Sequence, residues 1–191
     1  MDLGNVVGKT LMRALAVVLS VLAVAPSAFA QPKIVVTLSK SSNAAEAEAA
    51  VVDVEVKNTG NAPTYIFDPY LPMIDDKVLM NGRFNVIGAD GKNATYRGIS
   101  GKIILTKEGF RRFAPGDVRH FEVDLGVNYL ASPGMAKVSY LFVPYYDRPF
   151  DNSDGEDVKP AGKASSNTID VWFNPSLIEK RRSLLKSPGG N

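Results

Sequence analysis

Apolar and polar residues alternate with a period of two along much of the chain after residue 30. In VDVEVK (residues 52–57) each valine is followed by a charged residue, and in FEVDL (residues 121–125) apolar residues alternate with acidic ones. This pattern predicts antiparallel strands that bury one face and expose the other to water.

Further runs rich in β-branched and aromatic residues predict strands at residues 34–38, 65–67, 84–87, 95–96, 103–105, 135–143 and 168–173. Turn sequences separate these runs, including NTGNAP at residues 58–63 and the pair Asp90-Gly91, which is a strong hairpin signal. About eight short strands with frequent turns predict an all-β fold, specifically an immunoglobulin-like Greek-key β-sandwich with a short C-terminal helix.

The helix is predicted at the end of the chain. Asn174 is a suitable N-cap, and Pro175 suits the first helical position. The apolar stripe of this helix is predicted to consist of Leu177, Ile178, Leu184 and Leu185. We therefore expect one β-sandwich domain at residues 31–174 and a helix with a short tail at residues 175–191.

The first thirty residues are typical of a signal peptide. Lys9 and Arg13 precede an apolar run at residues 14–24, and a small-residue site predicts cleavage between Ala30 and Gln31. The apolar run is shorter than the roughly 20 residues that a spanning helix needs, which argues against an uncleaved anchor. We expect residues 1–30 to be removed and the mature protein to be periplasmic or secreted by a bacterium, with no stable membrane span. The absence of cysteine excludes disulfides.

Charge gives little indication of a partner, because the net charge is only +2. The one short basic cluster lies in the predicted helix and consists of Lys180, Arg181, Arg182 and Lys186. Nucleic-acid binders usually carry a larger basic face, so we expect no nucleic-acid partner. The helix could touch an anionic membrane, but its short apolar stripe favours packing on the sandwich.

The only histidine, His120, lies two residues before Glu122, a spacing that zinc hydrolases use. On a strand both would point to the same side as Asp124, away from the apolar residues between them. A zinc site usually needs three or four protein ligands, mostly histidine or cysteine. No G-x-S-x-G element accompanies the histidine. The pattern therefore favours an exposed polar face, and we expect no enzyme activity, catalytic residue, metal or cofactor.

An acidic segment, DRPFDNSDGEDVKP (residues 147–160), lacks periodicity and predicts a long exposed loop that extends to about residue 165. Its carboxylates could bind calcium, although their spacing does not match the twelve-residue calcium loop. A solvated loop is the favoured interpretation, and calcium binding is left open.

Aromatic residues gather near this loop. Tyr145 and Tyr146 stand where a strand enters the loop and Arg148 follows them, while Trp172 alternates with Val171 and Phe173. Amphipathic rings in such places commonly anchor partners. They also commonly fill cores, so both roles are open. Tyr145, Tyr146, Arg148 and Trp172 are the predicted partner-binding residues.

The order of features from residue 52 to residue 140 resembles a known module. The features begin with the turn at residues 58–63, followed by Tyr96-Arg97-Gly98 with Lys102. Next comes Pro115-Gly116, which follows Phe110 or Phe113. The last features are Asp124-Leu125 with Tyr129, and Gly134 with Val138 and Tyr140. This order resembles the N-terminal, non-catalytic β-sandwich domain of the deuterolysin and peptidyl-Lys metalloendopeptidase (aspzincin) family. The H-E-x-x-H helix of the catalytic domain is missing from this sequence.

The resemblance implies a non-enzymatic, exported domain that binds a protein partner, such as a secreted metallopeptidase. In that family the N-terminal region can act as a propeptide, so a separate copy is expected to be an inhibitor or a folding helper. The alternative is a carbohydrate or cell-wall binding module that uses Tyr145, Tyr146 and Trp172 as stacking platforms.

Overall fold

Antiparallel sheets are the main regular structure in the computed structural model, which describes residues 30–72, 74–75, 78–141, 143–147 and 159–186. The predicted all-β class is confirmed. The strands are β1 (Ile34–Lys40), β2 (Val51–Asn58), β3 (Thr64–Phe67), β4 (Ile74–Asp75), β5 (Val78–Leu79), β6 (Phe84–Ile87), β7 (Thr95–Tyr96), β8 (Phe110–Phe113), β9 (Val118–Asp124), β10 (Tyr129–Leu130), β11 (Gly134–Tyr140), β12 (Tyr145–Tyr146) and β13 (Ile169–Phe173). The helices are α1 (Ala44–Glu48), α2 (Leu125–Asn128) and α3 (Pro175–Lys186), with 3₁₀ turns η1 (Asp68–Tyr70) and η2 (Lys107–Gly109).

One three-stranded sheet has the order β1-β2-β9. The alternation in β2 sets its two faces: Val52, Val54 and Val56 are fully buried. Val54 lies opposite Leu38 of β1 and Phe121 of β9, so all three strands direct apolar side chains to the same side. Burial of each valine contributes about 1.5–3 kcal/mol, which fixes this register.

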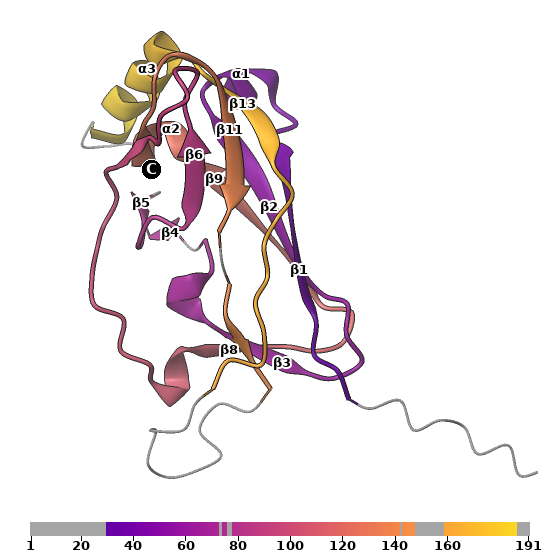
Figure 1. The fold of residues 1–191 in the computed structure, drawn as a ribbon. Coiled ribbons are helices and arrows are strands. Elements are labelled where there is room, and N and C mark those ends of the chain that lie inside the picture. Colours follow the sequence, from indigo (N-terminus) through magenta and orange to yellow (C-terminus); the bar gives the residue numbers. More distant parts are fainter. Residues whose placement is uncertain (1–29, 73, 76–77, 142, 148–158, 187–191) are drawn as a thin grey trace, which may run out of the picture.

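The second three-stranded sheet has the order β13-β11-β6. Its buried face carries Val171 and Phe173 from β13, Val138 and Tyr140 from β11, and Phe84 from β6. These side chains and the valines of β2 belong to one apolar core. The two sheets therefore form a sandwich-like pair, which Figure 1 shows as two layers of strands. The immunoglobulin-like Greek-key connectivity stays a prediction.

A smaller sheet, β12-β3-β8, closes one end of the core, and α3 lies at the other end (Figure 1). The turn at residues 58–63 joins β2 to this smaller sheet. The buried Asn58 organises it, because its Nδ2 donates to the carbonyls of Ala62 and Phe113 at 2.9 and 3.0 Å, while its Oδ1 accepts from the Gly60 amide at 3.0 Å.

Most predicted strands appear within one or two residues of their expected bounds, and so does the hairpin after β6. Gly91 has φ 76°, in the left-handed region that favours glycine, and the Gly88 amide donates to the Lys92 carbonyl at 2.8 Å. The predicted strand at residues 103–105 is wrong, because this run pairs with no other strand of the described chain. It leaves the sheets along one side of the molecule (Figure 1).

Helix α3 begins as predicted, since Asn174 Oδ1 accepts from the amides of Ser176 and Leu177 at 3.1 and 3.3 Å. Its predicted apolar stripe is wrong in part. Ile178 is buried, but Leu184 is exposed. The basic residues supply the rest of the packing face: Arg182 Nη2 donates to the Gly126 carbonyl at 2.6 Å. Two of the four cations of the basic cluster, Arg181 and Arg182, thus have partners in the rest of the fold.

The alternation predicted that Asp124 is exposed together with His120 and Glu122. This prediction is wrong for Asp124. Asp124 is buried, its Oδ1 caps α2 by accepting from the Val127 amide at 3.0 Å, and its Oδ2 accepts from Arg181 Nε at 2.7 Å. The reason is that α3 covers this end of the β1-β2-β9 sheet, which a strand pattern cannot reveal.

Candidate functional site

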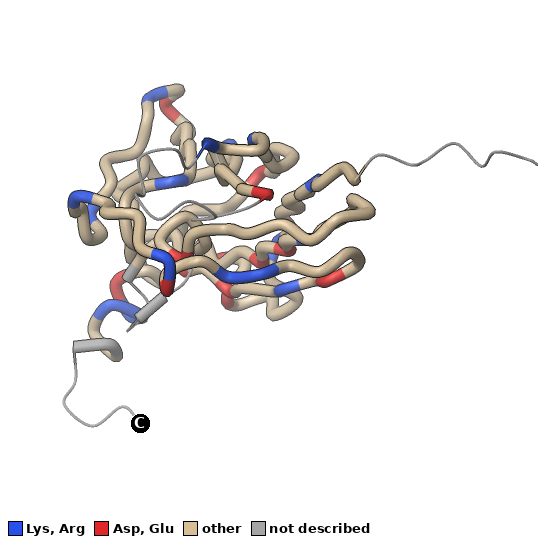
Figure 2. Tube along the Cα trace, turned by 90° about the horizontal axis from the view of Figure 1, so that it is seen from below, with Lys and Arg blue, Asp and Glu red and all other residues tan. Residues whose placement is uncertain are grey.

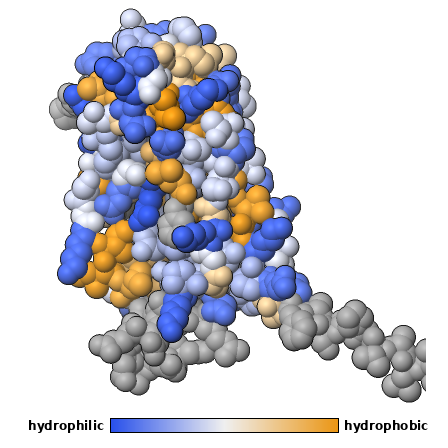
Figure 3. All heavy atoms as spheres, viewed as in Figure 1, coloured by the Kyte–Doolittle hydropathy of each residue, from blue (hydrophilic) through white to orange (hydrophobic). Residues whose placement is uncertain are grey.

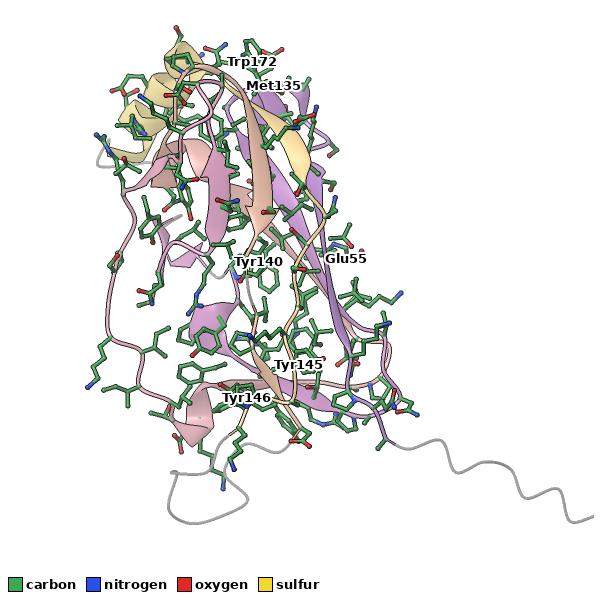
Figure 4. All side chains as sticks on the ribbon, viewed as in Figure 1. Glu55, Met135, Tyr140, Tyr145, Tyr146 and Trp172 are labelled. Carbon is green, nitrogen blue, oxygen red and sulfur yellow. The ribbon has the colours of Figure 1, made fainter. Side chains whose placement is uncertain are left out.

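The site with the clearest chemistry is an apolar pair on the outer face of the β13-β11-β6 sheet. Trp172 and Met135 lie directly opposite each other on β13 and β11, and each is 45% exposed. Their neighbours Val171 and Phe173 point into the core, so the strand alternation forces Trp172 outward. Figure 4 shows Trp172 and Met135 side by side at the end of the molecule that carries α3.

Polar residues border this pair. Lys137 follows Met135 on the same face of β11 and lies opposite Asp170 of β13, with Nζ and Oδ1 3.4 Å apart. An apolar centre with a charged border is the usual composition of a protein-contact surface. We call the surface formed by Met135, Lys137, Asp170 and Trp172 the Trp172 face.

Tyr145 and Tyr146, two of the predicted partner-binding residues, have buried side chains, which corresponds to the core-filling role that the sequence also left open. The Tyr146 ring meets Phe110 edge-on at 5.1 Å. Gly162 lies directly against the Tyr145 ring, because a Cβ at this position would overlap with the Tyr145 hydroxyl. Both tyrosines lie at the end of the molecule opposite the Trp172 face (Figure 4). Among the predicted residues, the structure therefore brings no tyrosine to Trp172.

Arg148 and most of the acidic segment, residues 148–158, lie outside the described residues. The segment leaves and rejoins the fold through backbone contacts. The Val143 amide donates to the Ala164 carbonyl at 3.2 Å, and the Ala161 amide donates to the Tyr145 carbonyl at 2.6 Å. The acidic loop thus connects two chain segments that run beside each other below β11 and β13.

His120 lies on the exposed face of the β1-β2-β9 sheet, over a shallow depression of about 370 Å³. The depression is lined by Thr37, Ser39, Asp53, Glu55, His120, Phe121 and Glu122. His120 Nε2 is 3.9 Å from Glu55 Oε2, and the two side chains are 70% and 41% exposed. Water screens such an exposed pair, so the contact is worth less than about 1 kcal/mol.

Metal ligation was the other chemistry that the sequence raised. In the part of the chain that the structure describes, no three or more His, Asp or Glu side chains are placed to share a metal ion. Arg148 and the central acidic loop lie outside the described residues.

The charged residues of the described chain are mixed rather than segregated. Figure 2 shows lysine and arginine interspersed with aspartate and glutamate along the trace. No helix among the described residues has both the length and the apolar character needed to cross a membrane.

Two surface features were missed by the sequence analysis. Met135 was part of a predicted strand but was not connected with Trp172, since strand register is needed to pair them. The second is the segment at residues 97–107, where Ile99 is 54% and Ile104 is 68% exposed, and where residues 102–105 have no backbone partner among the described residues. The available signal was the pair Lys102 and Lys107, which flanks the apolar run at residues 103–105. The sequence pattern predicted an ordinary strand for this run.

Comparisons with known proteins leave the family open. No protein-family description matches the chain, and no curated protein sequence matches it. Among solved structures, the ApaA protein from Bordetella pertussis shares 11% identity over 76% of this chain and 98% of that chain, with a TM-score of 0.42. The bacterial hydrophobin BslA shares 12% identity over 74% and 93%, with a TM-score of 0.23. These similarities are too low to indicate a common function, and the aspzincin resemblance stays a prediction.

Proposed function

We propose that this chain is a non-enzymatic binding domain that holds a partner protein against the Trp172 face. The observation that carries the proposal is the exposure of Trp172 directly beside Met135 on a rigid sheet. Tryptophan is enriched at the energetic centres of protein interfaces, and methionine adapts its shape to a partner. An indole exposed to water in this way is stabilised when a partner covers it.

The sheet makes the Trp172 face pre-organised. Met135 and Trp172 sit on paired strands whose opposite faces carry the fully packed Ala136 and Val171. A partner therefore does not have to order the backbone on binding, which removes part of the entropic cost of association.

The partner class we propose is a secreted peptidase, with the domain acting as an inhibitor or folding helper outside the cytoplasm. Two sequence features support it: the signal-peptide pattern before Gln31, and the resemblance of residues 52–140 to the N-terminal module of the aspzincin peptidases. Gln31 is also where contacts with the fold begin among the described residues, since its amide donates to Asn61 Oδ1 at 2.6 Å.

A test is to mix the purified protein with secreted metallopeptidases encoded near its gene and to measure complex formation, activity and refolding. The expected result is a complex that Trp172→Ala weakens by about tenfold or more, as for an interface centre. Asp170→Asn, a border change, should weaken it far less. If no complex forms and neither activity nor refolding changes, the peptidase assignment fails.

Carbohydrate is the second candidate, and the exposed indole of Trp172 is the observation that favours it. With Tyr145 and Tyr146 buried, only Trp172 among the three predicted platforms offers a ring face. The test is binding of the protein to cell-wall glycans. Binding that is lost in Trp172→Ala and that peptidase does not affect would favour this candidate over the first.

A further inference from the structure

The run from Lys102 to Leu105 has unused backbone hydrogen-bonding groups. Within the described chain, no N–H or C=O of these four residues takes part in a hydrogen bond, and none of them has a further contact of that kind. Backbone groups that are neither paired nor buried form an open template for another strand.

Both ends of this run are fixed. On one side the Gly101 amide donates to Asn81 Oδ1 at 3.0 Å, and the Asn81 amide donates to the Ile99 carbonyl at 2.7 Å. On the other side the Gly109 amide donates to the Thr106 carbonyl at 3.2 Å within η2, and the next residue, Phe110 of β8, pairs with Phe67 of β3. The unpaired residues are therefore held between two anchors, which lowers the entropic cost of pairing with a partner.

The side chains of the run alternate as in a strand. Ile103 and Leu105 are half-buried, whereas Ile104 between them is 68% exposed. One side of the run thus faces the domain and the other faces water. In Figure 3 a hydrophobic patch lies at the lower left, over the part of the molecule where Figure 1 shows this run.

The surroundings of the run are basic. Arg97, Lys102 and Lys107 are exposed, and the exposed Glu108 that follows them is the one acidic residue between positions 97 and 108. Cations on an open edge repel a like-charged strand and attract an acidic one.

From these observations we infer that residues 102–105 bind an extended, acidic segment of a partner protein by strand addition. The backbone of the run supplies the hydrogen bonds, Ile104 contacts an apolar side chain of the segment, and the lysines pair with its carboxylates. This surface is separate from the Trp172 face.

A second copy of the chain fits this edge less well. Antiparallel pairing centred on Ile104 would place Lys102 opposite Thr106 and Lys107 opposite Gly101. It would also bring Arg97, Lys102 and Lys107 of both copies together, with Glu108 as the one acidic residue beside them in each copy. An acidic strand meets no such repulsion.

Hydrogen–deuterium exchange on the full chain tests this inference, with a short peptide of alternating valine and glutamate as the probe. Without peptide, the amides of residues 102–105 should exchange at close to the unprotected rate. With peptide, exchange at every second residue of the run should slow by about tenfold or more, because a strand added along one edge pairs with alternate amides. A peptide of alternating valine and lysine should give no protection.

Matched variants separate the contribution of the backbone hydrogen bonds to peptide binding from the contribution of the lysine charges. Ile103→Pro and Ile104→Pro each remove one donor at a position with no hydrogen bond to lose, and the change at the residue whose N–H faces the peptide should abolish protection, whereas Ile104→Val should keep it. The double change Lys102→Glu and Lys107→Glu should transfer the preference to the lysine peptide. Trp172→Ala should leave peptide binding unchanged, so failure here and failure of the proposed function are distinguishable.

Four results would overturn the inference. The first is protection of the amides of residues 102–105 in the chain without peptide. If this protection increases with protein concentration, the edge pairs with a second copy of the chain. The second is binding of the acidic peptide without slower exchange in this run. The third is full binding by both Ile103→Pro and Ile104→Pro. The last is no binding of the acidic peptide at all.

Discussion

Arg181 of α3 and Asp124 at the end of β9 form an ion pair that attaches the C-terminal helix to the sandwich. Arg181 Nε and Asp124 Oδ2 are 2.7 Å apart, and the Asp124 side chain is only 4% exposed. Burial alone would lower the pKa of Arg181, but the hydrogen bond and charge of Asp124, with the charge of Glu46, raise it above its ordinary value. The guanidinium therefore stays charged opposite this carboxylate.

Removal of the arginine should destabilise the protein strongly. Arg181→Ala leaves the Asp124 carboxylate buried without its cation, which costs about 3 kcal/mol in the free energy of unfolding. Urea denaturation measures the loss. Lys180→Ala, at the exposed neighbouring position, should stay within about 0.5 kcal/mol of the parent protein. Equal stabilities of the two variants would show that the pair does not hold the helix.

Asn58 should prove equally important for the opposite end of the core. Asn58→Ala leaves the carbonyls of Ala62 and Phe113 and the amide of Gly60 without their partner, at a cost of about 2–4 kcal/mol. Thermal unfolding followed by circular dichroism checks this value. The exposed Asn93→Ala serves as the control, and a similar midpoint for both variants would contradict the assignment.

Stability should decrease in alkaline solution because of buried tyrosines. Burial, with a smaller effect of the nearby Tyr70, raises the pKa of Tyr146 from 10.0 to about 12, and burial raises the pKa of Tyr140 and Tyr129 as well. In this range the folded state keeps protons that the unfolded state releases, so this contribution to stability is complete below pH 10 and declines above it.

The test is a pH titration of tyrosinate absorbance for the folded and the urea-unfolded protein. Part of the seven tyrosines should ionise at higher pH in the folded protein, and the free energy of unfolding should fall between about pH 10 and pH 12. Tyr146→Phe should reduce that fall. Coincident titration curves in the two states would contradict the expected shift.

The proposed export makes a simple mass prediction. Protein recovered from the periplasm or the medium should begin at Gln31, since the signal-peptide pattern ends at Ala30. Mass spectrometry of the intact chain decides this. A mass that includes residues 1–30 would contradict cleavage.

The order of apolar and polar residues predicted those features of the fold that depend on residues close together in the sequence. The valines of β2 and the asparagine before α3 determine a strand face and a helix start within a few residues, and both were found as expected. Trp172 could also be placed on one of two faces, but only the packing of Val171 and Phe173 decided which face is buried.

Features that depend on distant residues were not predictable. Asp124 is buried because a helix more than fifty residues later covers it, and Tyr145 is buried because Gly162 lies against its ring. Residues 103–105 have the composition of a strand, yet no strand within the described ranges pairs with them. The pairing of Met135 with Trp172 likewise needs the register of β11 and β13.

The most direct test of the central proposal uses the fluorescence of Trp172, which is the only tryptophan in the chain. Without a partner, its emission should be that of an indole in contact with water, and acrylamide should quench it readily. When a bound peptidase covers the Trp172 face, the emission should shift to shorter wavelength and the quenching should decrease. Stable complex formation with unchanged emission and unchanged quenching would contradict the proposal.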